Sequence, residues 1–228
     1  MSIQPIRTLI CSALLCTVFS AYAQFNIKVG YNGNYANLEK TADIINRYSA
    51  NFPNKSQVLK PIRIYHGIEI GTRYKFNENL GFDFGISSAK GKSEVTGLFS
   101  LSSELIETEW KSSLNSLYIG LESLFESYGF GATIGYQQLT YKNKPNLNSD
   151  NIEILKQRAL NSRFNLIFEF TSLQNAFSFR PFVSINWQPY NVYNVELALF
   201  PDSQLPASDF NEDLMVFGIS LLIYNGPQ

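Results

Sequence analysis

An alternation of apolar and polar residues in the stretch Ile62 to Phe76 constrains the fold of this chain more than any other feature. Successive side chains of a β-strand point to opposite faces. One face of this stretch would be rich in isoleucine, with His66 among them, and the other would carry charges together with Gly67 and Gly71. Because glycine inside a strand marks close approach or tight curvature, the pattern predicts one apolar surface and one crowded polar surface.

Eight segments share this alternation, and the connections between them are alternately long and short. The expected strands are 24–35, 62–76, 80–88, 114–125, 128–141, 160–171, 177–188 and 212–224. Transmembrane barrels pair short periplasmic turns with long extracellular loops in this way. We therefore predict an all-β fold, an eight-stranded antiparallel up-and-down transmembrane β-barrel.

A soluble antiparallel barrel or sandwich with its apolar face inward is the alternative. Charges on the polar face do not separate the two, since a solvated surface would carry them as well. Glycine, however, gathers on the polar face, which suits the interior of a narrow barrel and has no reason on a solvated surface. Aromatic residues also gather near the strand ends, as in the interfacial belts of membrane proteins. Both observations favour a barrel in a membrane with its polar face inside.

The interior of an eight-stranded barrel is just wide enough for side chains to fill it. Charges enclosed there must pair, because an isolated buried charge is costly. Both signs occur on the polar face, so pairing is feasible. The charged lumen network that we predict is Lys28, Arg63, Glu69, Arg73, Asp83, Glu122, Arg163, Glu169 and Arg180. Pro181 cannot donate a ladder hydrogen bond and is expected near the periplasmic rim, at a bulge.

Residues 1–23 have the features of a secretory signal peptide. Arg7 supplies the positive charge, Leu9 to Phe19 the apolar run, and Ala21-Tyr22-Ala23 the small-x-small cleavage site. The apolar run is shorter than the ~20 residues that a membrane-spanning helix needs. We expect cleavage after residue 23, which leaves 24–228 as one barrel domain.

Both cysteines, Cys11 and Cys16, lie in this leader. The mature chain would then have no disulfide, thiolate metal site or cysteine nucleophile. The formal net charge of −1 gives no basic field that points to nucleic acid. Charged residues make up 16% of the chain, below the soluble average of roughly 25%.

The chain resembles the small eight-stranded outer-membrane β-barrel family of Gram-negative bacteria, the OmpA/OmpX-like and PorT-like domains, over Gln24 to Tyr224. The segments that carry the resemblance are IKVGYNGNYANL, IEIGTRYKF, LGFDFGIS, LYIGLE, GFGATIGYQ, FSFRPFVSINW and VFGISLLIY. The resemblance implies a location in the cell outer membrane. Many members end on a terminal aromatic residue, whereas this chain continues past Tyr224 with Asn-Gly-Pro-Gln.

Some barrels of this size modify lipids, and those resembling a hydrolase carry a His-Ser-carboxylate arrangement. This chain has a single histidine, His66, followed by Gly67 and Ile68, and Glu69 should face the opposite side. We expect no catalytic residue, no cofactor and no metal site. The acidic residues after Pro189 leave open a calcium or divalent-bridged contact with lipopolysaccharide, although a solvated acidic loop is favoured.

The long connections suggest where partners could bind. In the first, Ile44, Ile45 and Tyr48 would share one face of a short helix capped by Thr41. The stretches 93–110 and 191–200 show strand-like alternation above the expected membrane band, so strands could protrude there and pair with an incoming strand.

The expected partners are outer-membrane lipids and lipopolysaccharide, and an extracellular protein bound through loops 93–110 and 189–211. We expect a monomer that does not bind nucleic acid. The leading hypothesis for function is a closed, polar-core barrel with a structural or surface-interaction role and no enzymatic activity. The alternatives are a transport or secretion component, as a narrow channel or a subunit of an export machine, and, least favoured, a lipid-modifying enzyme.

Overall fold

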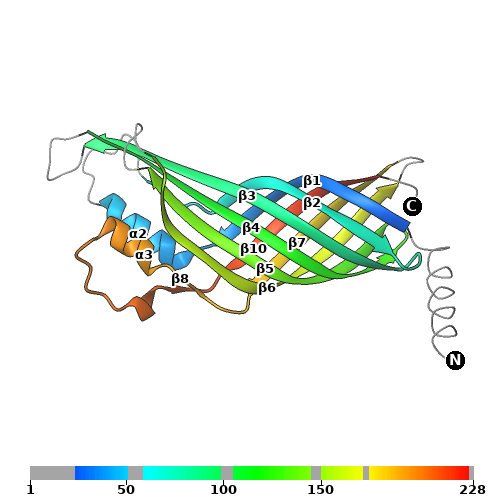
Figure 1. Ribbon diagram of the computed structural model, residues 1–228. Coiled ribbons are helices and arrows are strands. Elements are labelled where there is room, and N and C mark those ends of the chain that lie inside the picture. The colour runs from blue at the N-terminus through cyan, green and yellow to red at the C-terminus, as the bar shows by residue number, and fades with distance from the viewer. Residues whose placement is uncertain (1–23, 51–58, 99–104, 145–149, 172–174, 226–228) are drawn as a thin grey trace, which may run out of the picture.

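The computed structural model describes residues 24–50, 59–98, 105–144, 150–171 and 175–225, and it shows a closed antiparallel barrel (Figure 1). The barrel strands are β1 (Gln24–Asn37), β2 (Ile64–Lys75), β3 (Leu80–Leu98), β4 (Leu105–Phe125), β5 (Tyr128–Lys144), β6 (Ile152–Thr171), β7 (Asn175–Asn186) and β10 (Met215–Asn225). Their order around the barrel is β1-β10-β7-β6-β5-β4-β3-β2. The predicted eight-stranded antiparallel barrel is confirmed. The predicted leader, 1–23, lies outside the described residues.

The apolar face of each strand points outward. Ile68 and Ile70 are 58% and 41% exposed, whereas Glu69 between them is fully buried. The other strands follow the same rule, with exposed apolar residues such as Phe84, Ile119 and Phe164. The predicted inside-out arrangement is therefore confirmed.

Glycine on the inward face makes room for the charged interior. A Cβ atom at Gly71 would collide with the carbonyl oxygen of Phe84 and lie 2.7 Å from Cε of Lys28. Any other residue at this position would displace the strand or the lysine. The backbone approaches Gly67 and Gly120 equally closely, which is a physical reason for glycine at these inward positions.

Several strands continue well beyond the length that crosses a bilayer. A transmembrane strand needs about 9–11 residues, whereas β3 has 19 and β4 has 21. They pair along the whole of β3, from Leu80↔Ser123 to Leu98↔Leu105. Figure 1 shows this hairpin continuing beyond the ends of the neighbouring barrel strands on the loop side. The predicted strand extensions within 93–110 are confirmed in the described residues.

Short elements cover the loop end of the barrel. They are α2 (Glu39–Ala50), α3 (Tyr193–Leu199), a 3₁₀ turn (Ala207–Phe210) and a small sheet of β8 (Tyr190–Asn191) and β9 (Asn211–Glu212). Figure 1 places α2 and α3 side by side at this end, opposite the end where β1 begins. No helix among the described residues is long and apolar enough to cross a bilayer.

Two expectations about these elements were wrong. The stretch 191–200 was expected as a strand but contains α3. Its apolar residues Val192, Val195 and Leu199 also fit one face of a helix, and they pack into the apolar cluster that closes the loop end of the lumen, which we call the mouth. A short helix over 41–50 was expected to be capped by Thr41, but α2 begins at Glu39. Instead, the carboxylate of Glu212 accepts hydrogen bonds from the first-turn backbone N–H groups of Lys40 and Thr41, at 3.0 and 2.8 Å.

Pro181 lies near the middle of β7 rather than near the rim, so the expected position was wrong. It faces Ile219 of β10. On the β6 side the ladder is interrupted between the pairs Asn165↔Phe182 and Phe168↔Phe179. The interruption is what a residue without an N–H donor requires.

Candidate functional site: the lumen, its mouth and the outer wall

Eight of the nine charged residues predicted for the lumen meet in one buried network. Four are cationic and four are carboxylates, so their formal charges cancel. They are Lys28, Arg73, Arg163, Arg180, Glu69, Asp83, Glu122 and Glu169, and their residue exposures are all 6% or less. Six different barrel strands contribute them, so the network ties opposite walls together.

The part of the network nearer the short turns is built on two arginines. Arg73 Nε donates to Oε2 of Glu122 at 2.8 Å, and Arg73 also pairs with Glu169. Arg180 pairs with Glu122, lies 3.3 Å from Asp83 and 3.7 Å from Glu169. Each arginine is thus shared between at least two carboxylates, which offsets the cost of burying it.

The part nearer the loops is built on Glu69. Its carboxylate lies 3.2 Å from Nη1 of Arg163 and 3.6 Å from Nζ of Lys28. It also accepts hydrogen bonds from the hydroxyls of Tyr118, at 2.5 Å, and Ser220, at 2.8 Å. Lys28 pairs in addition with Asp83, whereas Glu69 is the only carboxylate paired with Arg163 among the described residues.

Aromatic rings complete the lumen, and the sequence reasoning did not assign them a role. The guanidinium of Arg163 lies 3.7 Å from the ring centroid of Phe182, and that of Arg73 lies 4.2 Å from that of Tyr224. Such contacts stabilise a cation in a desolvated site. Tyr118 lay on the polar face of its segment, so its position was a signal that could have identified it as a network member.

Arg63 is the predicted lumen residue that the structure places elsewhere. It precedes β2, and its Nη1 donates to the hydroxyl of Tyr35 on the outer face at 3.2 Å. Its neighbour Ile62 turns inward instead and is 4% exposed. The predicted alternation began two residues too early, because β2 begins only at Ile64.

Above the charged network the lumen is closed by apolar and aromatic side chains. Trp110, Tyr65, Tyr141 and Tyr190 are all fully buried there and belong to one cluster with residues of α2 and α3. A cavity of about 20 Å³ remains between this cluster and the network, beside Asn161 and Arg163. That is about the space of one water molecule.

Charged side chains join the elements at the loop end. Arg47 of α2 donates to Glu196 of α3 through both terminal nitrogens, at 3.2 and 2.5 Å. Burial raises the pKa of Glu212, although its hydrogen bonds to the start of α2 act in the opposite direction. On the protruding hairpin, hydrogen bonds from Lys111 and Lys92 lower the pKa of Glu109 to about 2.

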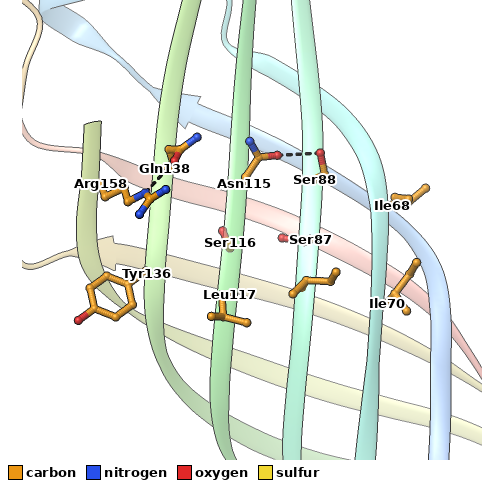
Figure 2. Close-up of a pocket in the computed structure, with 11 residues that line it drawn as sticks. Ile68, Ile70, Ser87, Ser88, Asn115, Ser116, Leu117, Tyr136, Gln138 and Arg158 are labelled. Atoms are coloured by element: carbon orange, nitrogen blue, oxygen red, sulfur yellow. Dashed lines mark hydrogen bonds between the residues drawn. The ribbon is translucent and has the colours of Figure 1, made fainter. Parts of the chain in front are cut away.

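A groove of about 590 Å³ lies on the outer wall, across β2 to β6 (Figure 2). Its lining is apolar toward the middle of the barrel and polar toward the loops. The lining residues are Ile68, Ile70, Ile86, Ser87, Ser88, Asn115, Ser116, Leu117, Tyr136, Gln138 and Arg158.

Metal and catalytic chemistry have little to draw on in the described part of the chain. No group of three or more His, Cys, Asp or Glu residues there is arranged to hold a metal ion. His66 lies on the outer face, where its Nδ1 is hydrogen-bonded to the hydroxyl of Tyr31. Its ring is therefore separated by the barrel wall from the buried carboxylate of Glu69.

The sequence matches no protein-family model. No curated protein matches it at a significant level. One solved structure that aligns is the attachment invasion locus protein Ail of Yersinia pestis in complex with the heparin analogue sucrose octasulfate. The alignment has a TM-score of 0.49 and 15% sequence identity, and it covers 90% of this chain and 98% of Ail.

Two further structures align over a similar length. Neisserial surface protein A gives a TM-score of 0.43 at 8% identity, with 89% of this chain and 97% of that chain covered. The outer membrane protein OprG of Pseudomonas aeruginosa gives 0.41 at 12% identity, with 90% and 97% covered. At TM-scores below 0.5 none of these likenesses indicates what this chain does.

Proposed function

We propose that this chain is an outer-membrane β-barrel with a closed polar core, which acts in a structural or surface-interaction role without enzymatic activity. The observation that carries the proposal is the inside-out distribution of side chains. Isoleucine, leucine and phenylalanine lie exposed around the whole wall, while eight charged residues are buried in the middle. In water such a wall would be a very large exposed apolar patch, whereas in a bilayer it is the surface that a closed barrel must present.

The proposed location follows from the leader and the loops. Residues 1–23 would direct the chain across the inner membrane and be removed. The barrel would then insert with its short turns in the periplasm and its helices and protruding hairpin outside the cell. Lipids, including lipopolysaccharide in the outer leaflet, would cover the apolar wall.

The lumen supports a closed barrel rather than a narrow channel. Paired charges fill its middle, and Trp110 and three tyrosines fill its loop end. An ion would have to separate pairs such as Arg180–Glu122 to pass, and breaking buried pairs is costly. No contact among the described residues supports the alternative function, a subunit of an export machine.

The loop end offers the surface for an interaction. Among the described residues, β2 pairs with β3 only as far as the pair His66↔Lys90, although β3 continues to Leu98. The segment around Lys60 covers part of that edge, since its backbone N–H donates to Ser93 Oγ at 2.9 Å. Among the described residues, no strand pairs with this side of β3 beyond Lys90, and an extended segment of a partner protein could join it there.

Heat-modifiable gel migration tests the proposal. The protein without residues 1–23 should refold into detergent micelles and migrate faster unheated than boiled. In planar bilayers it should give no conductance steps. A protein that stays soluble and monomeric without detergent would overturn the membrane proposal, and regular conductance steps would overturn the closed lumen.

A further inference from the structure

The outer groove is built from cross-strand rows of side chains, and neighbouring rows differ in character (Figure 2). One row is polar, with the pairs Ser88↔Asn115, Asn115↔Gln138 and Gln138↔Arg158. The row on its barrel-centre side includes the pairs Ile86↔Leu117 and Leu117↔Tyr136 and is mainly apolar. The groove therefore has one end that suits a polar group and one that suits hydrocarbon.

Arg158 is the charged residue of the polar row. Its Nε donates to Oε1 of Gln138 at 2.8 Å, which orients the guanidinium, since the planar group has five N–H donors in a fixed fork. Among the described residues, no carboxylate lines the groove. The lumen arginines Arg73, Arg163 and Arg180, by contrast, each have a carboxylate partner.

The neighbouring polar groups also leave capacity for an anionic ligand. Ser88 donates its hydroxyl to Oδ1 of Asn115 at 2.7 Å, which leaves the amide nitrogen of Asn115 as a donor on the same row. The amide nitrogen of Gln138 donates to Oγ1 of Thr140 at 3.3 Å and has a second hydrogen to donate. In the described part of the chain, the row thus places donors around one cation without a competing negative charge. Such sets recognise phosphate, and arginine does so with paired hydrogen bonds.

We propose that this groove binds one acyl lipid whose headgroup carries a phosphate, from the leaflet at the loop end. The phosphate lies on Arg158 with Gln138 and Asn115, and an acyl chain lies along Ile86, Leu117 and the isoleucines of β2. The volume of about 590 Å³ is in the usual range of small-molecule sites. The inference deepens the proposed function and rests on it, since only a barrel in a bilayer meets such a lipid.

Native mass spectrometry of the refolded barrel tests the site. The protein is exchanged with diphosphoryl lipid A, phosphatidic acid or a diacylglycerol with the same acyl chains, and bound lipid is counted after the detergent is removed in the gas phase. We expect a phosphate-bearing lipid to be retained over the diacylglycerol. Arg158→Gln should lower this retention by about tenfold, the worth of one charge-assisted contact.

Two pairs of variants make the test specific. Lys156→Gln removes a cation two residues away on β6, where Lys156 lies outside the groove lining and within 4.0 Å of Glu153, and it should not change retention. Leu117→Trp fills the apolar end and should lower retention, whereas Ile119→Trp, one outward position farther along β4 and outside the lining, should not.

Each other result contradicts a stated part of the inference. Equal retention by wild type and Arg158→Gln, or equal loss in Lys156→Gln, would overturn the site. Displacement of the lipid by millimolar inorganic phosphate would show an anion site rather than a lipid site. Gel migration separates this inference from the proposed function. Wild-type protein that migrates as a folded barrel but shows no lipid selectivity would refute only the proposed lipid site. A chain that never shows the heat-modifiable form would refute both the lipid site and the membrane barrel.

Discussion

The pairing of Glu69 with Arg163 gives the sharpest prediction for stability. Glu69→Gln keeps the shape of the side chain but only one acceptor oxygen, whereas the hydroxyls of Tyr118 and Ser220 donate to different oxygens of Glu69. It also removes the only carboxylate paired with Arg163 among the described residues. Lys28 is less affected, because it retains Asp83. The substitution leaves a buried cation without a counter-charge in a fully enclosed site.

The expected cost is at the lower end of the range for a broken buried pair. Removing one partner of such a pair costs about 3–5 kcal/mol. Arg163 keeps its hydrogen bonds to Asn165 and Ser220, at 2.8 and 2.9 Å, and its contact with the ring of Phe182. We therefore expect Glu69→Gln to lower the free energy of unfolding by about 3 kcal/mol.

Urea unfolding of the barrel in lipid vesicles, followed by the gel-migration shift, measures this quantity. The double variant Glu69→Gln with Arg163→Met should recover at least about 1 kcal/mol, since Arg163→Met removes the buried cation that Glu69→Gln leaves without a counter-charge. Glu153→Gln is the matched control: Glu153 and Lys156 have side chains 45% and 50% exposed, so its effect should stay within about 1 kcal/mol. A Glu69→Gln protein as stable as the control, or a double variant as unstable as the two single changes added, would refute the reasoning.

Three further predictions concern the wall, the mouth and the hairpin. Gly71→Ala should destabilise the barrel by about 1–3 kcal/mol because a Cβ atom there collides with the neighbouring strand. Gly81→Ala is the control: its Cβ would lie 3.6 Å from the nearest atom, so the free energy of unfolding should change by no more than about 0.5 kcal/mol in the same assay. Equal effects of the two substitutions would contradict the crowding argument. Glu196→Gln removes the ion pair with Arg47 and should speed amide hydrogen exchange of α3 without changing the barrel strands; unchanged exchange in α3 would show that apolar packing alone holds the mouth. Glu109 has a lowered pKa, so its stabilisation of the hairpin is full above its unfolded pKa of about 4.3 and is lost as the pH falls toward about 2. Protection of the hairpin amides from hydrogen exchange, corrected for the intrinsic exchange rate, should fall in that pH window for the wild type and not for Glu109→Gln.

The barrel could be predicted from the sequence because the alternation of apolar and polar residues is visible within each strand and has a physical cause. A strand buried against lipid on one side and charges on the other must alternate at every residue, and glycines such as Gly71 mark the crowded side. The same rule placed eight lumen charges correctly, since their parity along each strand is fixed once the strand is found. It failed for Arg63, where the strand had not yet begun.

The mouth was harder to predict, since its contacts join segments far apart in the chain. The N-terminus of α2 is satisfied by Glu212, which is 171 residues away from Thr41. Nothing in the local spacing around either residue indicates that partner. The stretch that contains α3 fits both a strand and a helix by apolar spacing, and only the packing of Val195 into the mouth decides between them.

The side of the wall that faces lipid is the central claim, and quenching by lipid-bound spin labels tests it most directly. The segment 24–228 contains no cysteine, so single cysteines at Ile68, Ile70 and Ser220 can each be treated with a fluorescent thiol reagent after the barrel has folded in bilayers with doxyl-labelled lipid. The account predicts labelling and strong quenching at Ile68 and Ile70, which are exposed, and almost no labelling at Ser220, which is fully buried. Ready labelling and strong quenching at Ser220, with protection of the two isoleucine positions, would contradict it.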